Sequence, residues 1–424
     1  MKRFTVRLLI LGGLFLALSY SPQLFSLPFW PEFLTSHAQG PEIKKFFVFD
    51  AHMHPMSAAY RGGWNIGDSA DPQFSLSMAR QGGLGAVFVN TSIDEFYAFN
   101  HIAVKEILRQ FNHVYGQIAM YPDQIGMARN AQEVRELQKQ GKLAVILSIS
   151  GGSAIESDLT VLPMLHRLGL RLISPMHFYE NSIGDVGTST KNNGMGSGLT
   201  PFGRDFVAEM NRLGIVIDLA HASEQTSRDI IEASTQPVIN SHVAARGVLD
   251  RTGNWSDEMM RVLARKGGVI CVPTGLPQRV SRAFSEKYPG RGVPRSRITG
   301  TGPLLYTGDP SQIYDFINER NQENELRLEA QRRERYPDIP PLSDYIEHVD
   351  YMVKVMGVDH VGISSDWGYP KALVKGIENA GEYQNIAQAL LRRGYSDEDV
   401  AKIMGGNVLR FFDEVVKTAP KLTN

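Results

Sequence analysis

Histidine and aspartate residues follow strand-like segments at four places that lie far apart in the sequence. One segment leads into two histidines two residues apart, two later segments each end in a histidine, and the last ends in an aspartate. These residues are His52, His54, His221, His242 and Asp366. Imidazole nitrogens and carboxylate oxygens are ligands of zinc, and side chains from distant positions converge at the carboxyl ends of parallel strands. The pattern predicts a metal site at that end of a parallel sheet.

The spacing of His52 and His54 adds a geometric constraint. Side chains two residues apart in a strand lie on the same face, so both imidazoles can bind one ion. A lone histidine at a strand end is more often a structural residue that makes a hydrogen bond. Four separate strand ends that carry such residues favour metal binding. Asp50, on the same segment, is expected to orient one of the ligand imidazoles.

The elements that must position these residues follow a βα rhythm. Short apolar runs alternate with helix-length amphipathic stretches from about residue 45 to the end of the chain, as in repeated βα units around a parallel sheet. Strands are expected at 46–49, 84–90, 114–120, 143–148, 170–174, 215–219, 238–241, 269–272 and 361–363. We assign 114–120 as an accessory strand, because it carries no candidate ligand and closely follows a helical segment at 101–111. The expected fold class is therefore α/β, a (β/α)₈ TIM barrel.

Helix signals and two irregular segments complete this architecture. Thr200 and Pro201 should begin a helix that ends at Gly214, and Ser223 should begin another that ends near Ser234. Residues 184–203 are rich in Gly, Ser, Thr and Asn, so they are expected to form a mobile loop that covers a ligand. Residues 273–341 form an insertion between the last two strands, with a charged helical stretch at 318–335. Because it follows a strand's carboxyl end, we expect a lid or a partner surface.

Composition excludes some classes of partner. The chain has 424 residues with 44 Lys and Arg against 45 Asp and Glu, so no basic surplus predicts nucleic-acid binding. The single cysteine, Cys271, excludes an internal disulfide and is expected to be a small buried hydrophobe.

The amino terminus predicts export. Three basic residues precede the apolar run 8–18, which is the layout of a secretory signal. We expect residues 1–38 to be a signal peptide or a membrane anchor with a linker, and residues 39–424 to be the metal-binding barrel. The expected location is the bacterial periplasm, and attachment to the inner membrane is the alternative. The sequence leaves a homodimer open.

A series of ordered motifs carries a family resemblance. They are SGGS at 150–153, GLTPFG at 198–203, EMNRLG at 209–214, DLAHAS at 218–223, PVINSH at 237–242, AARG at 244–247, DHVGISSD at 359–366 and GGNVLR at 405–410. With these motifs the chain resembles the renal or membrane dipeptidase family, the M19 zinc peptidases of the amidohydrolase superfamily. The resemblance covers nearly everything after the leader. It implies a (β/α)₈ barrel that holds two zinc ions and hydrolyses dipeptides.

The resemblance also implies roles for individual residues. The family's metal ligands fall on His52, His54, His221, His242 and Asp366. Asp366 would also carry a proton, and His177, after the strand at 170–174, would contact the substrate. The alternative for His177 is a hydrogen bond with the loop at 184–203. These roles suit a metal-activated water, a carboxylate that moves its proton and a histidine that stabilises the developing oxyanion.

Three positions depart from the family pattern. His54 replaces the family's aspartate, and a His-x-His pair is common elsewhere in the superfamily. Ser150 replaces the glutamate that bridges the two ions. Serine is neutral and too short to span ions roughly 3.5–4 Å apart, and two Zn²⁺ beside Asp366 alone would leave about three uncompensated positive charges. One zinc ion is therefore expected rather than two, held by His52, His54 and one or both of His221 and His242, with Asp366 near the water.

The third departure concerns the substrate. The family arginine that binds the substrate carboxylate aligns with Gly253, so Arg251, two residues away, is our candidate substrate-binding residue. We expect an exported metal-dependent hydrolase that cleaves an amide bond of a small peptide or peptide-like substrate. The alternative is a periplasmic tailoring or maturation protein for a peptide natural product, such as a siderophore, without ordinary dipeptidase activity. A third hypothesis, a binding protein with a relic site, is disfavoured by the intact histidine and aspartate set.

Overall fold

The computed structural model describes the chain from residue 45 onward. The described residues are 45–67, 71–93, 95–188, 191, 196–287, 307–319, 338–368 and 373–418. The chain divides into residues 1–44 and a second unit, 45–424, and the expected leader at 1–38 lies outside the described residues. So does the charged stretch at 318–335, apart from its first two residues. Within the described ranges, no helix has both the length and the apolar character needed to cross a bilayer.

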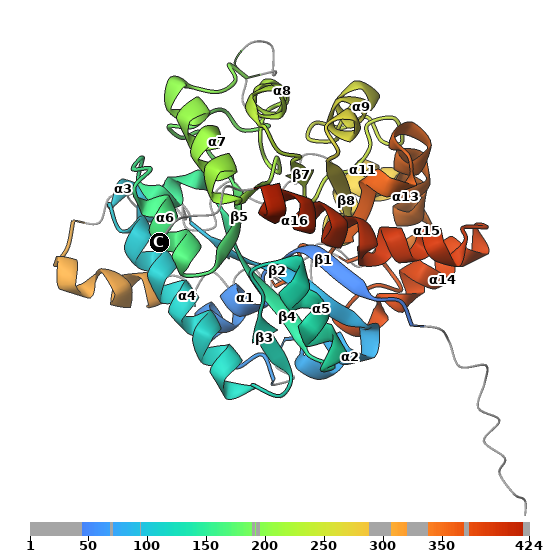
Figure 1. Cartoon of the computed structure of the whole chain (residues 1–424), viewed down its shortest axis with the longest axis horizontal. Helices are drawn as coiled ribbons and strands as arrows, with labels where there is room; N and C mark the ends of the chain where they lie inside the picture. The colour runs from blue at the N-terminus through green and yellow to red at the C-terminus, as the bar shows by residue number, and fades with distance from the viewer. Residues whose placement is uncertain are drawn as a thin grey trace, which may run out of the picture. The chain divides into compact units, whose positions relative to one another are not determined.

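Parallel strands curl around one another in the second unit (Figure 1). One sheet has the order β1-β2-β4-β5-β6 and the other β7-β8-β9. Their bounds are β1 Val48–Met53, β2 Leu84–Ser92, β4 Leu143–Ser150, β5 Leu170–Ser174, β6 Val216–Ile217, β7 Ile239–Asn240, β8 Val269–Pro273 and β9 Val361–Ser364. An isolated parallel bridge from Asp218 to Ile239 joins β6 to β7. These features confirm the α/β, TIM-barrel-like fold.

The two ends of this strand order meet just beyond β1 and β9. The Asp366 amide donates to the His52 carbonyl at 2.8 Å, and the His54 amide donates to the Trp367 carbonyl at 2.6 Å. The backbone that joins the first strand to the last is therefore the backbone that carries three of the predicted ligands.

Helices lie outside the strands and connect them (Figure 1). The larger ones are α1 Pro55–Gly62, α4 Ala103–Met120, α5 Ala131–Lys139, α7 Pro201–Leu213, α8 Glu224–Ala233, α9 Asp257–Arg265, α13 Leu342–Met356, α14 Gln384–Arg392 and α16 Asn407–Thr418. The shorter ones are α2 Leu76–Gly82, α3 Glu95–Phe99, α6 Val161–Arg167, α10 Pro277–Val280, α11 Arg282–Lys287 and α15 Asp397–Ala401. Single turns occur at Gly152–Ile155, Pro310–Gln312, Val358–His360, Ala380–Glu382 and Lys402–Gly406.

Capping residues lie where the sequence predicts the starts of α7 and α8 and the end of α7. The Thr200 hydroxyl accepts a hydrogen bond from the Gly203 amide at the start of α7, and Gly214 ends α7 with φ of 67°. The Ser223 hydroxyl accepts from the Thr226 amide at the start of α8. Such caps satisfy the amides that a helix leaves unpaired in its first turn. Both helices lead directly into strands that precede a histidine.

The accessory strand predicted at 114–120 is wrong, because these residues form the last turns of α4. Ile107, Phe111 and Val114 are buried and recur at helical spacing, whereas Met120 is 52% exposed. A short apolar run does not by itself distinguish the two periods. An accessory strand does exist a few residues later, as β3 Ile125–Met127, which pairs in parallel with β4.

The barrel interior is apolar at the amino ends of the strands and polar at their carboxyl ends. Phe49, Phe88 and Cys271 belong to the interior cluster, and α16 closes it with Phe411 and Phe412. Cys271 is fully buried, as expected. Alternation along β2, β4, β5 and β6 then brings a polar side chain to the same face near each strand's end. These side chains are Asn90, Ser148, Ser150, Ser174 and Asp218, all fully buried or nearly so.

Candidate metal centre

The predicted ligands converge at the carboxyl end of the strands in two histidine pairs. In the first pair the Nε2 atoms of His52 and His54 lie 3.0 Å apart. Asp366 Oδ1 lies 3.4 Å from His54 Nε2 and 3.8 Å from His52 Nε2. All three side chains are buried, with 2%, 3% and 6% of their surface exposed. Among the described residues, these three form a group whose ligand atoms all lie within 4.8 Å of one another.

The second pair consists of His221 and His242, whose Nε2 atoms are also 3.0 Å apart. Burial, followed by the charge of His52, lowers the pKa of His242 well below its ordinary value. His242 is therefore neutral near pH 7. The two pairs are neighbours, because the rings of His52 and His242 lie 4.2 Å apart between centroids.

His177 and the loop at 184–203 border the second pair. The His177 ring meets the His221 ring edge-on at 4.9 Å, and the Gly187 amide donates to the His221 carbonyl at 2.7 Å. The described part of the loop therefore packs beside the site. Residues 189, 190 and 192–195 lie outside the described residues.

Two residues of the site have an unusual backbone conformation. His221 has φ of 65° and Asp366 has φ of 57°, in the left-handed region that residues with a Cβ rarely adopt. His221 comes four residues after the end of β6 and Asp366 two residues after the end of β9, so the backbone turn sets the direction of each side chain. Strain of this kind concentrates at functional sites.

A buried hydroxyl holds two of the imidazoles in place. Ser241 Oγ donates to Asp218 Oδ2 at 2.6 Å, and it lies 2.9 Å from His242 Nδ1 and 3.3 Å from His52 Nδ1. Since the hydroxyl hydrogen points to Asp218, the Oγ lone pairs accept from the ring N–H groups. Each Nε2 is then left without hydrogen and faces the site, which is the tautomer that a metal requires.

His52, Asp218 and His242 form a second group within 4.8 Å, but we do not read it as a metal site. Ser241 Oγ lies between their atoms and bonds to all three. Asp218 also accepts from Ser174 Oγ at 2.6 Å. Burial raises the pKa of Asp218, and these serine hydroxyls oppose that shift.

The Asp218 to Ser241 contact gives a testable prediction. Replacing Ser241 with alanine should weaken zinc binding about 10- to 100-fold, because the ligand His52 loses the acceptor that fixes its orientation. Competition with a zinc chelator measures this affinity. The matched control is Ser174→Ala, which removes one hydrogen bond to Asp218 but touches no imidazole. Equal losses in the two variants would contradict the orienting role.

The spacing of His52, His54 and Asp366 fits one zinc ion. Four-coordinate zinc with bonds of roughly 2.0–2.2 Å holds its ligand atoms roughly 3.4 Å apart, and the three atoms here are 3.0, 3.4 and 3.8 Å apart. Three protein ligands leave one position for water, as in catalytic zinc sites.

The family resemblance implies a bridging glutamate at position 150, and uncharged side chains lie there instead. Ser150 Oγ accepts a hydrogen bond from Asn90 Nδ2 at 2.6 Å, and the same Nδ2 lies 3.1 Å from His52 Nε2 and 3.5 Å from His54 Nε2. Asn90 Oδ1 accepts from Ser148 Oγ at 3.3 Å. A neutral amide and a hydroxyl thus occupy this position. Sequence reasoning found Ser150 but missed Asn90, whose signal is its place at the end of a predicted strand.

Other carboxylates of this region bond elsewhere. Glu156 accepts from the Val104 amide at 3.1 Å, Asp158 accepts from Thr160, and Asp185 is paired with Lys191 at 3.1 Å. None of them belongs to either group of metal-binding side chains among the described residues.

Asp50 positions the backbone instead of an imidazole, which corrects the expectation that it orients a ligand ring. Its Oδ1 accepts from the amides of His52 and Ser365, at 2.9 and 3.1 Å, and Tyr383 donates to its Oδ2. Burial raises the pKa of Asp50 to about 6. The carboxylate therefore ties the end of β1 to the end of β9.

The proposed substrate arginine, Arg251, makes a local contact. Its guanidinium donates to Ser285 Oγ at 2.5 Å. A different arginine, Arg279 of α10, interacts electrostatically with Asp366 and His242. It lies in the insertion after β8, where no motif marked it.

His348 lies outside the ligand set and gives a prediction about stability. It is fully buried on α13, where Nδ1 accepts from the Ala245 amide at 3.0 Å and Nε2 donates to the Val280 carbonyl at 3.1 Å. Burial lowers the pKa of His348 to about 4. Its ordinary value is about 6.5, so the folded protein keeps it neutral where the unfolded chain binds a proton.

The contribution of neutral His348 to stability is complete above pH 6.5 and is lost as the pH falls toward 4. The loss should reach about 3 kcal/mol. In urea unfolding, His348→Gln should be less stable than the wild type at pH 7, and the gap should narrow between pH 6.5 and 4.5. A constant gap would show that His348 titrates normally.

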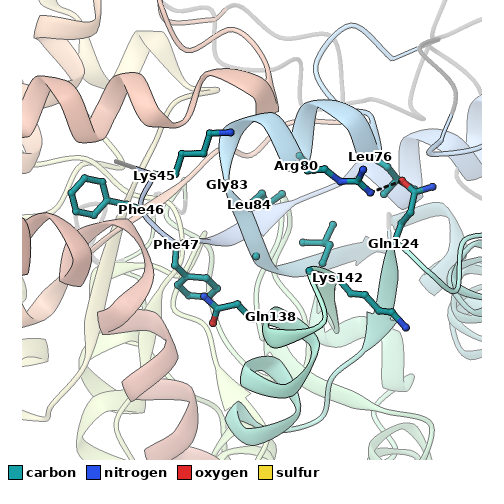
Figure 2. Close-up of a pocket in the computed structure, with 14 residues that line it drawn as sticks. Lys45, Phe46, Phe47, Leu76, Arg80, Gly83, Leu84, Gln124, Gln138 and Lys142 are labelled. Carbon is teal, nitrogen blue, oxygen red and sulfur yellow. Dashed lines mark hydrogen bonds between the residues drawn. The ribbon is translucent and has the colours of Figure 1, made fainter. Parts of the chain in front are cut away.

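One pocket lies at the opposite end of the strands (Figure 2). It has a volume of about 210 Å³ and is lined by the amino-terminal ends of β1, β2 and β4, with Lys45, Arg80 and Lys142 among its side chains. It is separate from the histidine cluster, and we assign it no role.

A parallel barrel with clustered histidines and a carboxylate at the carboxyl ends of its strands defines a metal-dependent hydrolase of the amidohydrolase type. The family model for the membrane dipeptidases, peptidase family M19, matches residues 41–424. The chain therefore belongs to the M19 membrane dipeptidase family.

Individual relatives agree with this assignment. Dipeptidase tcpJ from Claviceps purpurea is 28% identical over 346 residues, which cover 80% of this chain and 68% of that protein. The probable dipeptidase PvdM from Pseudomonas aeruginosa is 26% identical, with a TM-score of 0.68 over 88% of this chain and 96% of that one. A metallopeptidase from Rhodobacter sphaeroides, liganded with a phosphinate mimic of L-Ala-D-Ala, shares the fold at 19% identity and a TM-score of 0.67, over 88% of this chain and all of that one.

Proposed function

We propose that this protein hydrolyses an amide bond of a small peptide at a single zinc ion held by His52, His54 and Asp366. The observation that carries the proposal is the convergence of these three buried side chains, with ligand atoms 3.0 to 3.8 Å apart. A zinc ion bound there would lower the pKa of a water molecule to about 7 and polarise the scissile carbonyl.

The protein's own groups would move the proton and stabilise charge. The Asp366 carboxylate accepts a proton from the attacking water and returns it to the departing amine. His221 and His177 border the site from the other side, where an imidazole N–H can donate to the oxygen that becomes negative. In this proposal His221 contacts the substrate oxygen, and His221 and His242 are not the ligand set of a second ion.

The single-ion count is supported by the contacts of Asn90 and Ser150. A second ion beside His221 and His242 would have two neutral protein ligands and no bridging carboxylate, because an amide and a hydroxyl take that place. Dications with so little compensating charge are bound poorly.

The test combines metal content with turnover. Elemental analysis of the purified, zinc-loaded protein should give one ion per chain, and a panel of dipeptides should release amino acids. His54→Ala should lose both the ion and the turnover. Stoichiometric zinc without cleavage of any dipeptide would reject ordinary dipeptidase activity but retain the metal site.

Zinc binding without dipeptide cleavage would favour the second candidate function, a tailoring or maturation role on an exported peptide natural product. The Asn90 amide and the Ser150 hydroxyl favour this role. They stand where a bridging carboxylate would supply the negative charge that two-ion hydrolysis requires. Deletion of the gene should then leave an immature exported peptide product, and a normal product profile would count against this role.

Export to the periplasm belongs to the same proposal. It is supported by the basic residues before the apolar run 8–18. Fusion of residues 1–44 to a reporter that is active only outside the cytoplasm tests it, with the three basic residues replaced by glutamate as the control.

A further inference from the structure

Asn90 is an uncharged side chain buried beside two of the proposed zinc ligands. It lies on β2, paired with Ser148 of β4, and none of its surface is exposed. Its Nδ2 lies 3.1 Å from His52 Nε2 and 3.5 Å from His54 Nε2. Ligand atoms of four-coordinate zinc lie roughly 3.4 Å apart. The end of the Asn90 amide is therefore close enough to share an ion with both imidazoles.

The hydrogen bond from Asn90 to His52 and a zinc ion on His52 exclude each other. Ser241 Oγ accepts from His52 Nδ1, so His52 Nε2 carries a lone pair and accepts from Asn90 Nδ2. Zinc binds an imidazole through the same lone pair. An ion there would also face the hydrogens of the amide, which carry partial positive charge. Zinc binding therefore requires the amide to change its orientation.

Two serine hydroxyls allow the amide to turn in place. Ser150 Oγ lies 2.6 Å from Asn90 Nδ2, and Ser148 Oγ lies 3.3 Å from Asn90 Oδ1. A hydroxyl can donate and accept. After a half-turn of the amide, Ser150 would donate to Oδ1 and Ser148 would accept from Nδ2. All three side chains are fully buried, where an unpaired polar group is costly, and the same two partners serve both orientations.

We infer that Asn90 turns its amide and binds the zinc ion through Oδ1, as a fourth protein ligand. The half-turn puts an oxygen where Nδ2 now lies, beside His52 and His54. Amide carbonyl oxygens bind divalent cations, and catalytic zinc expands to five ligands, so a position remains for water. A residue of β2 thus supplies the oxygen ligand that Ser150 is too short to provide. The inference rests on the proposed function, because it assumes the zinc site of His52, His54 and Asp366.

The experiment measures the zinc affinity of the full-length protein by competition with a chelator, without substrate. Asn90→Leu keeps the size of the side chain but has no oxygen, so its Kd for zinc should rise at least about 10-fold. An amide that only donates to His52 predicts the opposite, because its removal would expose the lone pair and lower Kd. Asn90→Asp keeps an oxygen and adds a charge, so it should bind zinc at least as tightly as the wild type.

The matched control is Thr91→Val. Thr91 is also buried on β2, and its hydroxyl donates to the Ser148 carbonyl at 2.8 Å. Successive side chains of a strand point to opposite faces, so this variant loses a buried hydrogen bond on the face away from Asn90, and its zinc affinity should match that of the wild type.

Cobalt in place of zinc gives a second readout. The visible absorption of protein-bound Co²⁺ weakens as the number of ligands rises from four to five. The absorption of the cobalt-loaded protein should therefore be stronger in Asn90→Leu than in the wild type.

The outcomes separate this inference from the proposed function. If the protein cleaves no dipeptide, a raised Kd in Asn90→Leu still supports the inference. A lowered or unchanged Kd, an unchanged cobalt absorption, or an equal rise of Kd in Thr91→Val would overturn the inference and leave the proposed hydrolysis standing. A wild-type protein that binds no zinc would overturn both. If its melting temperature shows that Asn90→Leu has not folded, Asn90→Ala decides by the same rise or fall of Kd.

Discussion

Replacing Asp366 with asparagine should lower kcat for dipeptide hydrolysis at least about 100-fold. Asparagine keeps the size of the side chain but cannot accept the proton of the attacking water. It also removes the one negative charge of the three-residue ligand group, so zinc affinity should fall as well. Measuring kcat at saturating zinc separates the two effects, because added zinc restores occupancy but not proton transfer.

The matched control for Asp366→Asn is Asp359→Asn. Asp359 precedes β9, whereas Asp366 follows it, and Asp359 is paired with the Lys402 ammonium at 3.1 Å on the surface. Exposed pairs of this kind contribute little to stability, so the control should keep wild-type turnover. Full activity of Asp366→Asn at saturating zinc would show that another group moves the proton.

Restoring a carboxylate at position 150 should double the number of bound ions. In the double variant Asn90→Ala and Ser150→Glu, the smaller residue 90 leaves room for the glutamate side chain, and the added charge lies beside the pair of His52 and His54. Elemental analysis after equilibration with excess zinc should rise from one ion per chain to two. A bridging carboxylate lowers the repulsion that otherwise excludes the second ion.

The single variant Asn90→Ala serves as the control for that change. Asn90→Ala alone should remain at one ion, because it opens space without adding charge. Two ions in the wild type would show that the charge argument is wrong, and one ion in a folded double variant would show that His221 and His242 do not form a second site.

The strands near the site could be predicted from the sequence, because each is a short apolar run followed by a histidine or an aspartate. The apolar runs before His52, His221, His242 and Asp366 all form strands or their immediate extensions. The run at 114–120 was assigned to a strand because, over so few residues, the apolar pattern of a buried helix cannot be told from that of a strand. Sequence reasoning could have found Asn90 and Asp218, since each continues the period-two interior face of its strand.

Arg279 could not have been found in this way. It lies on the four-residue helix α10, inside an insertion, and its position depends on contacts with Gly253 and on the path of the chain beside Asp366. Such contacts arise from tertiary packing, which no local pattern encodes. The orienting role of Ser241 was hidden for the same reason, because its partners come from three separate strands.

The meeting of β1 with β9 has a consequence for the whole barrel. An ion held by His52, His54 and Asp366 would act as a clasp across this junction, joining positions more than 300 residues apart in the chain, 52 and 366. Any ligand that binds only the closed ring stabilises it by mass action. Depleting the protein of metal should therefore loosen the ring first at this junction, and the amides of Asp366 and His54 should exchange hydrogen faster before the remaining strands do.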